Sequence, residues 1–528
     1  MRRAYKHLVL VALVSLFVGL GMTSSYQEGS LAQTAPPPQP NIIFILADDM
    51  RYDDLNARYM PQTTKELVEK GMSFQNAFVS NPLCCPSRAT IMRGQYSHNT
   101  DVWFNTNVYN PDPNVRDGGW LGYNRNGYED NNLATNLQAA GYTNGLFGKY
   151  LNGYIDATDN TRPQGWQDWF AFKTIGYYNY DVIDHDGTIN PTTPPTTKHF
   201  GTTKSAYSTN VLNSQVQEFI GNTTSQGKPF FGKPFFAYVA PYAPHGPATP
   251  GPGDGQTFNG LRAPRPLSFN EQDVTDKPPW IQSLRRLTSD DIANIDKRHE
   301  NRVESLQAVD DLVGAVVRKL GQQGVLSNTY IVFTSDNGFH HGEHRIRQGK
   351  ARPYEESVRV PLVISGPGVA AGSTTDKFVL NTDYFPTFME LAGAQTQTPS
   401  YVDGRSLRPL LTGPPPPSWR TAILLEGRKN SADPEIVLDR NYNGIRMSTT
   451  EGEIRKYIEY ESLSGSGSIR ELYDLTPSAD PLELTNTYSS ADPNVPELDA
   501  RLDALKGCQP VDLATPEEEI PCQKAEGP

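Results

Sequence analysis

The sequence lacks any block of Lys and Arg residues that could follow a phosphate backbone. Its 528 residues include 47 basic and 59 acidic side chains, which leave a net charge of −12 and a pI near 5.3. This charge disfavours nucleic-acid binding, so no nucleic acid is expected as a partner. The 26 Tyr, 21 Phe and 6 Trp exclude an extended disordered chain, and 44 Gly with 43 Pro indicate long loops around a folded scaffold.

Cysteine is scarce, with four residues in the whole chain. Cys508 and Cys522 lie near the C-terminus and are separated by a loop that can close, so we expect a disulfide between them, a bond that belongs to exported proteins. Cys84 and Cys85 are adjacent, and adjacent cysteines seldom bond to each other without strain. Two unpaired thiols therefore remain and require a chemical explanation.

Long apolar runs are absent beyond the N-terminus, so no later segment could span a membrane. The apolar run 8–22 follows Arg2, Arg3 and Lys6 and precedes a small, polar stretch. This arrangement predicts a secretory signal peptide and spacer over 1–35, although an uncleaved anchor would look similar. The protein is therefore expected to be secreted or periplasmic, with no stable membrane span once the signal is removed.

Alternation of polar and apolar residues is missing from the best strand candidates. The runs 41–46, 235–240 and 330–334 are continuously apolar, which is typical of parallel strands buried on both faces. Helical patterns lie between them, above all at 302–320, and a helix at 132–140 with a strand at 141–147 repeats the plan. We expect an α/β fold with a large, mainly parallel sheet sandwiched by helices.

The Pro-rich run 413–417 marks the predicted domain boundary, between a large domain at 40–412 and a smaller α+β subdomain at 418–528. In the subdomain we expect a small antiparallel sheet and one outer helix with Pro493 in its first turn, formed by 422–426, 442–447, 454–459 and 492–505. Two Pro- and Gly-rich segments are interpreted as surface loops near the ligand side, 188–203 and 244–266.

Polar residues follow each of the three predicted parallel strands. Because ligands of open α/β sheets bind beyond the carboxyl ends of the strands, these residues mark the candidate site. They are Asp48 and Asp49, then Pro244 and His245, and last Asp336 and Asn337. The carboxylate and amide oxygens are ligands that select Ca²⁺ above all and Mg²⁺ next. A single Asp pair would more often cap a helix, but polar pairs at two strand ends favour a metal.

The segment Cys84-Cys85-Pro86-Ser87-Arg88 is the most specific local signal. Pro86 suits the first turn of a helix, which would place Cys84 at a helix N-terminus. There the helix dipole and Arg88 are expected to lower the thiol pKa below its free value of about 8.5. A buried structural cysteine pair is an equally good interpretation of these residues alone.

Seven motifs, in order along most of the chain, resemble the type I sulfatases of the alkaline phosphatase superfamily. They are ILADDM (45–50), CCPSRATIMRGQY (84–96), GKYLNGY (148–154), APHGP (243–247), SDNG (335–338), GEH with a later Lys (342–350) and YDLTPSADPLELTN (473–486). One such motif could arise by chance, whereas the ordered set is highly specific. CCPSR together with GKYLNGY is most similar to the N-acetylglucosamine-6-sulfatase and arylsulfatase branch.

The resemblance implies that Cys84 is oxidised to formylglycine by a formylglycine-generating enzyme, and that the hydrated aldehyde is the nucleophile. This would explain one unpaired thiol and leave Cys85 as a small buried residue. Arg88 would orient the hydrate. The resemblance also implies that residue 84 shares one Ca²⁺ with four oxygen ligands, Asp48, Asp49, Asp336 and Asn337.

Three further polar positions of the family match Lys149, His245 and Lys350. By resemblance, Lys149 and Lys350 contact the sulfate oxygens and the leaving group. His245 would protonate the departing alcohol, a role that Lys350 could share. A lone lysine is usually solvated, but the apolar residues 145–147 before Lys149 fit a strand end better.

Other positions are interpreted less directly. Glu343 is expected to support the metal ligands without binding the ion itself, and His344 is expected to contact the substrate. His340 and His341 would line the entrance of the site or simply be exposed. Many arylsulfatases carry His two residues after the motif Lys, and this chain has Leu151 there. The base for the second hydroxyl is therefore unassigned.

Three functions are compatible with the residues. The first is hydrolysis of sulfate monoesters, either sulfated carbohydrates such as N-acetylglucosamine 6-sulfate or aryl sulfates. The second is phosphate or phosphonate ester hydrolysis, which the single set of metal ligands disfavours. The third is non-catalytic glycan binding. A binding protein needs no modifiable nucleophile, so the intact set of Cys84, Arg88 and metal ligands disfavours this function. An acidic surface would repel a highly sulfated polymer, so such a substrate requires a local basic cleft.

Overall fold

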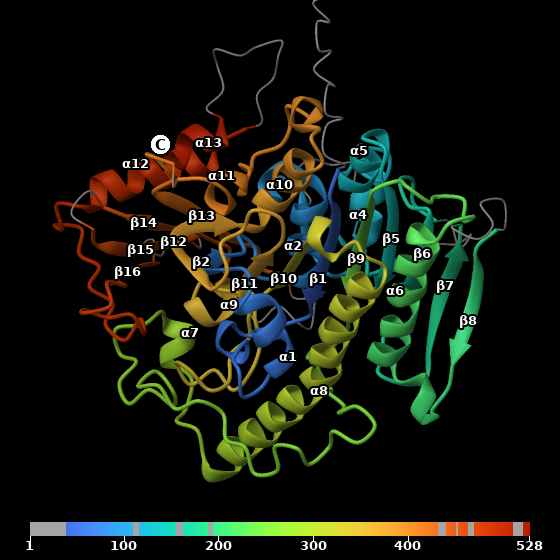
Figure 1. Ribbon diagram of the computed structural model, residues 1–528. Coiled ribbons are helices and arrows are strands. Elements are labelled where there is room, and N and C mark those ends of the chain that lie inside the picture. The colour runs from blue at the N-terminus through green and yellow to red at the C-terminus, as the bar shows by residue number, and fades with distance from the viewer. Residues whose placement is uncertain are drawn as a thin grey trace, which may run out of the picture. The chain divides into compact units, whose positions relative to one another are not determined.

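A sheet of ten strands runs through the computed structural model of the protein (Figure 1). From edge to edge its strands are β12 (Ser373–Leu380), β2 (Met72–Phe78), β11 (Leu362–Ser365), β10 (Thr329–Ser335), β1 (Asn41–Ala47), β9 (Phe235–Ala240), β5 (Thr143–Gly148), β6 (Asp168–Phe172), β7 (Tyr180–Asp186) and β8 (Thr196–Phe200). The structure describes residues 39–108, 116–154, 162–187, 194–414, 416–430, 440–449, 452–462, 469–509 and 521–528.

The centre of the sheet is parallel. β1 pairs in parallel with β10 on one side and β9 on the other, and β5 continues the parallel order between β9 and β6. β11, β7 and β8 pair with their neighbours in the antiparallel sense. The predicted mainly parallel sheet is confirmed, and five adjacent strands, β10, β1, β9, β5 and β6, direct their carboxyl ends to one edge.

Helices cover both faces of the sheet, and α6 and α8 lie in front of it in Figure 1. Ile43 and Ile45 of β1 pack in the same core cluster as residues of α6 and α8, whereas Ile42 and Phe44 pack with residues of α2, α5 and α10. Burial on both faces explains the unbroken apolar sequence of β1. The longer helices are α2 (Cys84–Arg93), α5 (Leu133–Ala139), α6 (Ser208–Thr224), α8 (Ser289–Gln322), α10 (Tyr384–Leu391) and α12 (Val495–Lys506). Shorter ones are α1 (Pro61–Thr63), α3 (Ser97–Thr100), α4 (Gly119–Arg125), α7 (Pro279–Gln282), α9 (Glu355–Val358), α11 (Arg408–Leu411) and α13 (Cys522–Ala525).

Two helices differ from their predicted bounds. α8 begins at Ser289, not at residue 302, and its N-terminus is held by a capping box between Thr288 and Asp291. The first half of α8 is largely polar, so the sequence has no apolar periodicity there that would predict a helix. α12 begins at Val495 with Pro496 in its first turn, so the prediction for Pro493 is wrong.

One of the two predicted surface loops is wrong in part. The segment 244–266 contains no helix or strand, as expected. Residues 196–200, however, form the edge strand β8, while 188–193 lie outside the described residues. Because most side chains of β8 are exposed, the strand carries no apolar pattern that would reveal it.

The predicted C-terminal sheet is present, with four antiparallel strands. They are β13 (Ala422–Gly427), β14 (Tyr442–Ser448), β15 (Ile454–Tyr460) and β16 (Ile469–Asp474), of which β16 was not predicted. β13 contacts β12 and α12 packs against β13 and β14. Contacts join residues 39–528 into one compact unit. A small parallel pair, β3 (Val102–Phe104) and β4 (Asp117–Gly118), lies apart from both sheets.

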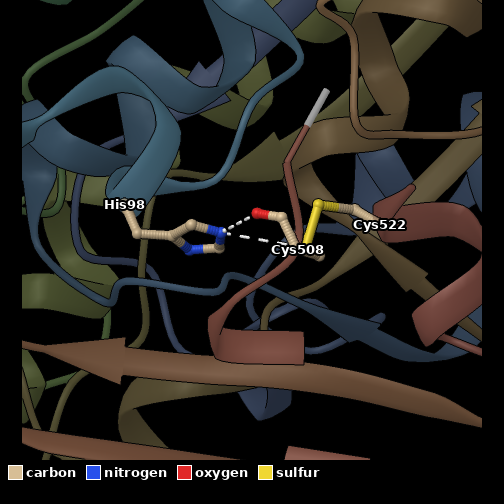
Figure 2. A group of neighbouring side chains, drawn as sticks. All are labelled: His98, Cys508 and Cys522. Atoms are coloured by element: carbon tan, nitrogen blue, oxygen red, sulfur yellow. Dashed lines mark hydrogen bonds between the residues drawn. A yellow bond between two sulfur atoms is a disulfide. The ribbon is translucent and has the colours of Figure 1, made fainter. Parts of the chain in front are cut away.

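The predicted disulfide joins Cys508 to Cys522, whose Cα atoms are 4.9 Å apart. Figure 2 shows His98 pointing at this bridge, with Nε2 3.0 Å from the Cys508 carbonyl oxygen. The other ring nitrogen, Nδ1, lies 3.0 Å from Glu426 Oε2. Burial would lower the pKa of His98, but the Glu426 carboxylate raises it overall. Across the described residues, no helix combines the length and apolarity needed to cross a membrane.

We predict that Gly148→Ala destabilises the fold. Gly148 ends β5 with a φ of +111°, and a Cβ there would lie 2.1 Å from the carbonyl oxygen of Ala240. Left-handed strain and overlap with backbone together should cost about 2 kcal/mol or more of the free energy of unfolding, measured by urea denaturation. Gly201→Ala is the control, because its Cβ would enter open space. Equal effects of the two substitutions would contradict the prediction.

Candidate functional site

Side chains from the carboxyl ends of four adjacent strands meet beside the N-terminus of α2. They are Asp48 and Asp49 after β1, Lys149 after β5, His245 in the turn after β9, and Asp336 with Asn337 after β10. Parallel neighbours necessarily end at the same edge of the sheet, so residues nearly 300 positions apart in the chain become neighbours. Lys350, from the loop before α9, completes the group.

Cys84 is the first residue of α2, and Pro86 lies in the first turn of that helix. The Cys84 Sγ atom is 2.7 Å from Lys350 Nζ, 3.4 Å from Asp48 Oδ1 and 3.7 Å from Asp49 Oδ1. Residue 84 thus lies at the centre of the group formed at the strand ends.

The thiol of Cys84 is completely buried. Burial raises its pKa well above the ordinary value, and the ammonium groups of Lys149 and Lys350 offset this only in part. The prediction of a lowered thiol pKa is therefore wrong, because the loss of solvation outweighs the nearby positive charges. An unmodified thiol at this position would be a poor nucleophile at neutral pH.

Each carboxylate of the site is paired with a basic side chain. Lys149 Nζ lies 2.6 Å from Asp48 Oδ2, Lys350 Nζ 2.7 Å from Asp49 Oδ1, and Arg88 Nε 2.8 Å from Asp336 Oδ2. All six side chains are almost fully buried.

The pairing shifts the pKa values of these groups. Burial raises the pKa of Asp48, but Lys149 and its other basic neighbours lower it overall. For Asp336, burial and the neighbouring Asp48 carboxylate raise the pKa despite Arg88. Burial lowers the pKa of Lys149, yet Asp48 raises it overall. The Lys149 ammonium group is therefore held in its charged form within the site.

The oxygen atoms of the site suit a hard divalent cation. Asn337 donates Nδ2 to Asp49 Oδ1 at 2.7 Å, and Asp336 Oδ1 accepts from the Asp49 amide at 3.0 Å. The amide oxygen of Asn337 is buried and has no hydrogen-bond partner among the described residues. A buried acceptor without a partner, placed beside three carboxylates, is what an oxygen-ligated cation requires.

His245 is the most accessible member of the group, with 17% of its side chain exposed. Its Nε2 atom lies 3.6 Å from Asp49 Oδ2, and its Nδ1 lies 2.8 Å from the carbonyl oxygen of Gly246. The ring stacks on Tyr242 with centroids 4.7 Å apart. One edge of the ring therefore faces the buried carboxylates, and part of the side chain reaches solvent.

Arg302 holds the site together, although sequence reasoning did not single it out. From α8 it donates Nη1 to the carbonyl oxygen of Pro244 at 3.0 Å and Nη2 to that of Asp49. Its guanidinium lies 4.3 Å from the centroid of the Phe339 ring. One side chain thus contacts the segments after β1, β9 and β10. The available signal was a basic residue at the start of an otherwise apolar helical pattern.

Glu343 and His344 support the loop before Lys350. Glu343 accepts from Arg51 Nη1 at 3.0 Å and from the backbone amide of His341 at 2.6 Å. His344 is buried, with Nδ1 2.7 Å from Glu271 Oε2, and its described contacts include no residue of the group around Cys84.

The predictions for two other histidines are wrong. His340 and His341 are both fully buried, so neither is exposed or lines an entrance. Burial lowers the pKa of each well below the ordinary value. Leu151 packs in the hydrophobic core and offers no base.

We predict that Lys149→Met destabilises the metal-free protein. The substitution leaves the Asp48 carboxylate buried without its closest cation, at a cost of about 3 kcal/mol or more. Urea unfolding in the presence of a chelator measures the effect. Adding Asp48→Asn to the same chain removes the unpaired charge and should restore most of the loss. If the double variant is no more stable than Lys149→Met, the unpaired Asp48 carboxylate is not the cause of the lost stability.

Known proteins align with nearly the whole chain. A family model described as "Sulfatase" matches residues 40–394, and one described as "N-sulphoglucosamine sulphohydrolase, C-terminal" matches 342–506. N-acetylglucosamine-6-sulfatase of Homo sapiens is 32% identical over 515 residues, covering 92% of this chain and 88% of its own. An arylsulfatase of Volvox carteri is 30% identical and covers 91% of this chain and 76% of its own.

A solved structure also resembles this fold. It is described as a complex of a protein with its substrate D-glucosamine-2-N,6-O-disulfate, and it aligns with a TM-score of 0.66. The alignment covers 88% of this chain and 97% of that chain at 24% identity. At this identity the likeness concerns the fold alone.

Proposed function

The chain belongs to the sulfatase family of sulfuric ester hydrolases, and from this premise we propose its substrate class and its catalytic groups. The substrates are sulfated carbohydrates such as N-acetylglucosamine 6-sulfate, or aryl sulfates, and the reaction uses formylglycine at position 84 and one Ca²⁺. One observation carries the proposal: Cys84 lies at the start of α2, in contact with two carboxylates and an ammonium group. The names of the relatives support a glucosamine or aryl ester.

The oxygen ligands for the cation would be Asp48, Asp49, Asp336 and Asn337, with the oxidised residue 84. Ca²⁺ is preferred over Mg²⁺ because several carboxylates share the site. When bound, the cation supplies charge that neutralises sulfate oxygens and lowers the pKa of the attacking hydroxyl. The three carboxylates are already matched by three basic side chains, so a divalent cation adds the positive charge needed to hold a singly charged sulfate ester.

Formylglycine at position 84 would supply, as its hydrate, two hydroxyl groups. One would displace the alcohol at sulfur, and loss of the proton from the other would release sulfate as the aldehyde forms again. Lys149 and Lys350, which flank Cys84, bind the sulfate oxygens. Arg88 uses Nε to hold Asp336, and its Nη2 has no partner among the described residues. That free N–H group orients the oxygen atoms of residue 84.

His245 provides the proton for the departing alcohol. The carbonyl oxygen of Gly246 can only accept a hydrogen bond, so the adjacent Nδ1 carries a proton. Nε2 lies 3.6 Å from Asp49 Oδ2 and faces the site, so a ring that is protonated at both nitrogens would present its second proton there. This arrangement directs an acidic N–H toward the leaving oxygen, and Lys350 can share the role.

We also propose that the protein is exported, to the periplasm or the medium, and that a formylglycine-generating enzyme acts on it during maturation. The predicted signal peptide over 1–35 lies outside the described residues. The disulfide between Cys508 and Cys522 supports an oxidising compartment.

We predict that Cys84→Ala abolishes turnover of both an aryl sulfate and N-acetylglucosamine 6-sulfate while the fold is retained. The matched control is Cys85→Ala, since both cysteines are buried at the start of α2. The control should keep most of the activity. Mass spectrometry of the peptide around residue 84, from protein made with a formylglycine-generating enzyme, should find the aldehyde or its hydrate. Substantial turnover by Cys84→Ala would overturn the mechanism.

We predict that strong chelation removes activity and that added Ca²⁺ restores it. One equivalent of calcium should be measurable in the native protein by elemental analysis. Asp336→Asn removes one anionic ligand and should lower calcium affinity about tenfold or more, measured by calorimetry. Full activity after exhaustive removal of metal would contradict the proposal that a cation bound to these carboxylates is needed for catalysis.

A further inference from the structure

A basic pocket lies at the C-terminal sheet of this acidic chain. Its volume is about 540 Å³, and its basic lining residues are Arg116, Arg428, Lys429 and Lys506. The same wall contains two carboxylates, Glu459 and Glu461. The volume is in the range of small-molecule sites, about 300–1,000 Å³. Basic side chains thus outnumber acidic ones here, whereas the whole chain has the opposite balance.

Arg428 is the central cation of this pocket. Its guanidinium donates to the carbonyl oxygens of Gly427 and Tyr442 and to Asn443 Oδ1, all of them neutral acceptors. None of the ion pairs among the described residues includes it. The guanidinium lies 4.2 Å from the centroid of the Trp103 ring. The described residues give this half-buried arginine no direct ion pair, so its N–H groups can still bind an anion, although the Glu426 and Glu461 carboxylates attract its charge.

A second guanidinium faces the same indole ring. Arg116 lies 5.8 Å from the centroid of Trp103 and pairs with Asp101 at 3.1 Å, with 47% of its side chain exposed. Burial lowers the pKa of Arg428 and the positive charge of Arg116 adds to this effect, while the Glu426 and Glu461 carboxylates oppose it. Two like charges are therefore held close together, and an anion placed between them would relieve their repulsion.

The carboxylates of the pocket are already engaged. Glu459 pairs with Arg470 at 2.7 Å and with Lys506 at 3.4 Å. Glu461 Oε2 accepts from Asn441 Nδ2 at 2.6 Å. Lys429, by contrast, is exposed and forms no described ion pair. Among the described residues, Arg428 and Lys429 are therefore the basic lining residues outside ion pairs, and Glu461 is the acidic one that only a neutral amide contacts.

Phe104 and Tyr460 also line the pocket, but both are more than nine-tenths buried. Polar contacts to the basic side chains must therefore hold a ligand here. Phe104 is followed by Asn105, whose Oδ1 accepts from the backbone amide of Cys85 at 2.9 Å. One hydrogen bond therefore links the segment that carries Phe104 to the start of α2.

We propose that this pocket binds a sulfated sugar residue of a polysaccharide chain, at a position other than the ester that is hydrolysed. The proposal rests on the proposed function in one respect, the sulfated carbohydrate as substrate. The pocket is the local basic surface that an acidic enzyme needs in order to hold such a polymer. Arg428, Arg116 and Lys429 bind the sulfate oxygens.

The test measures binding separately from turnover. In the full-length Cys84→Ala chain, calorimetry compares a heparin oligosaccharide with the same oligosaccharide after desulfation. Arg116→Ala with Lys429→Ala removes two exposed charges and should weaken heparin binding about tenfold. Arg428→Gln is a second variant, checked by its unfolding curve. Arg318→Ala, which removes a charge from the surface of α8, is the matched control and should bind as the parent does.

The outcomes are decisive in either direction. Weaker binding by the pocket variants, with unchanged turnover of a small aryl sulfate when residue 84 is restored, supports the site. Binding equal to that of Arg318→Ala overturns it, and so does equal affinity for the desulfated chain. Failure of the wild-type enzyme to hydrolyse any sulfate ester would refute the proposed function instead. A turnover assay, separate from the binding measurement, detects this outcome.

Discussion

Burial of three carboxylates in one site is the constraint on which the rest of the structure depends. Charges removed from water are tolerated only when they are paired, and here Asp48, Asp49 and Asp336 each face a basic side chain. Those basic side chains come from β5, α2 and a distant loop. The parallel sheet, the position of α2 and the path of the loop before α9 are therefore all required by the same local balance of charge.

The sequence contained enough information for the central sheet and for most residues of the site. Continuous apolar runs marked β1, β9 and β10 because these strands are buried on both faces, and Asp48, Asp336 and His245 could be located because they follow strand ends. Features that depend on the surroundings of a residue could not be read in this way. The exposed edge strand β8 has no apolar pattern, and the polar first half of α8 has no periodicity.

Tertiary burial also explains the errors in chemistry. The position of Cys84 at a helix start indicates an activated thiol, and only the structure shows that complete burial reverses this effect. The histidines after β10 were expected near solvent, because polar residues usually are, yet both are enclosed. The role of Arg302 could not be predicted from the sequence. It donates hydrogen bonds to the carbonyl oxygens of Asp49 and Pro244, which approach each other only in the folded chain.

Complete burial of Cys84 has a consequence for the order of events in biosynthesis. Because the side chain is fully buried, it cannot enter the active site of another enzyme without extensive opening of the native protein. If residue 84 is converted to formylglycine, as proposed, the conversion must therefore precede folding of the chain around it. Under that proposal, protein that folds first would lack the nucleophile, so the yield of active protein would depend on the relative rates of oxidation and folding.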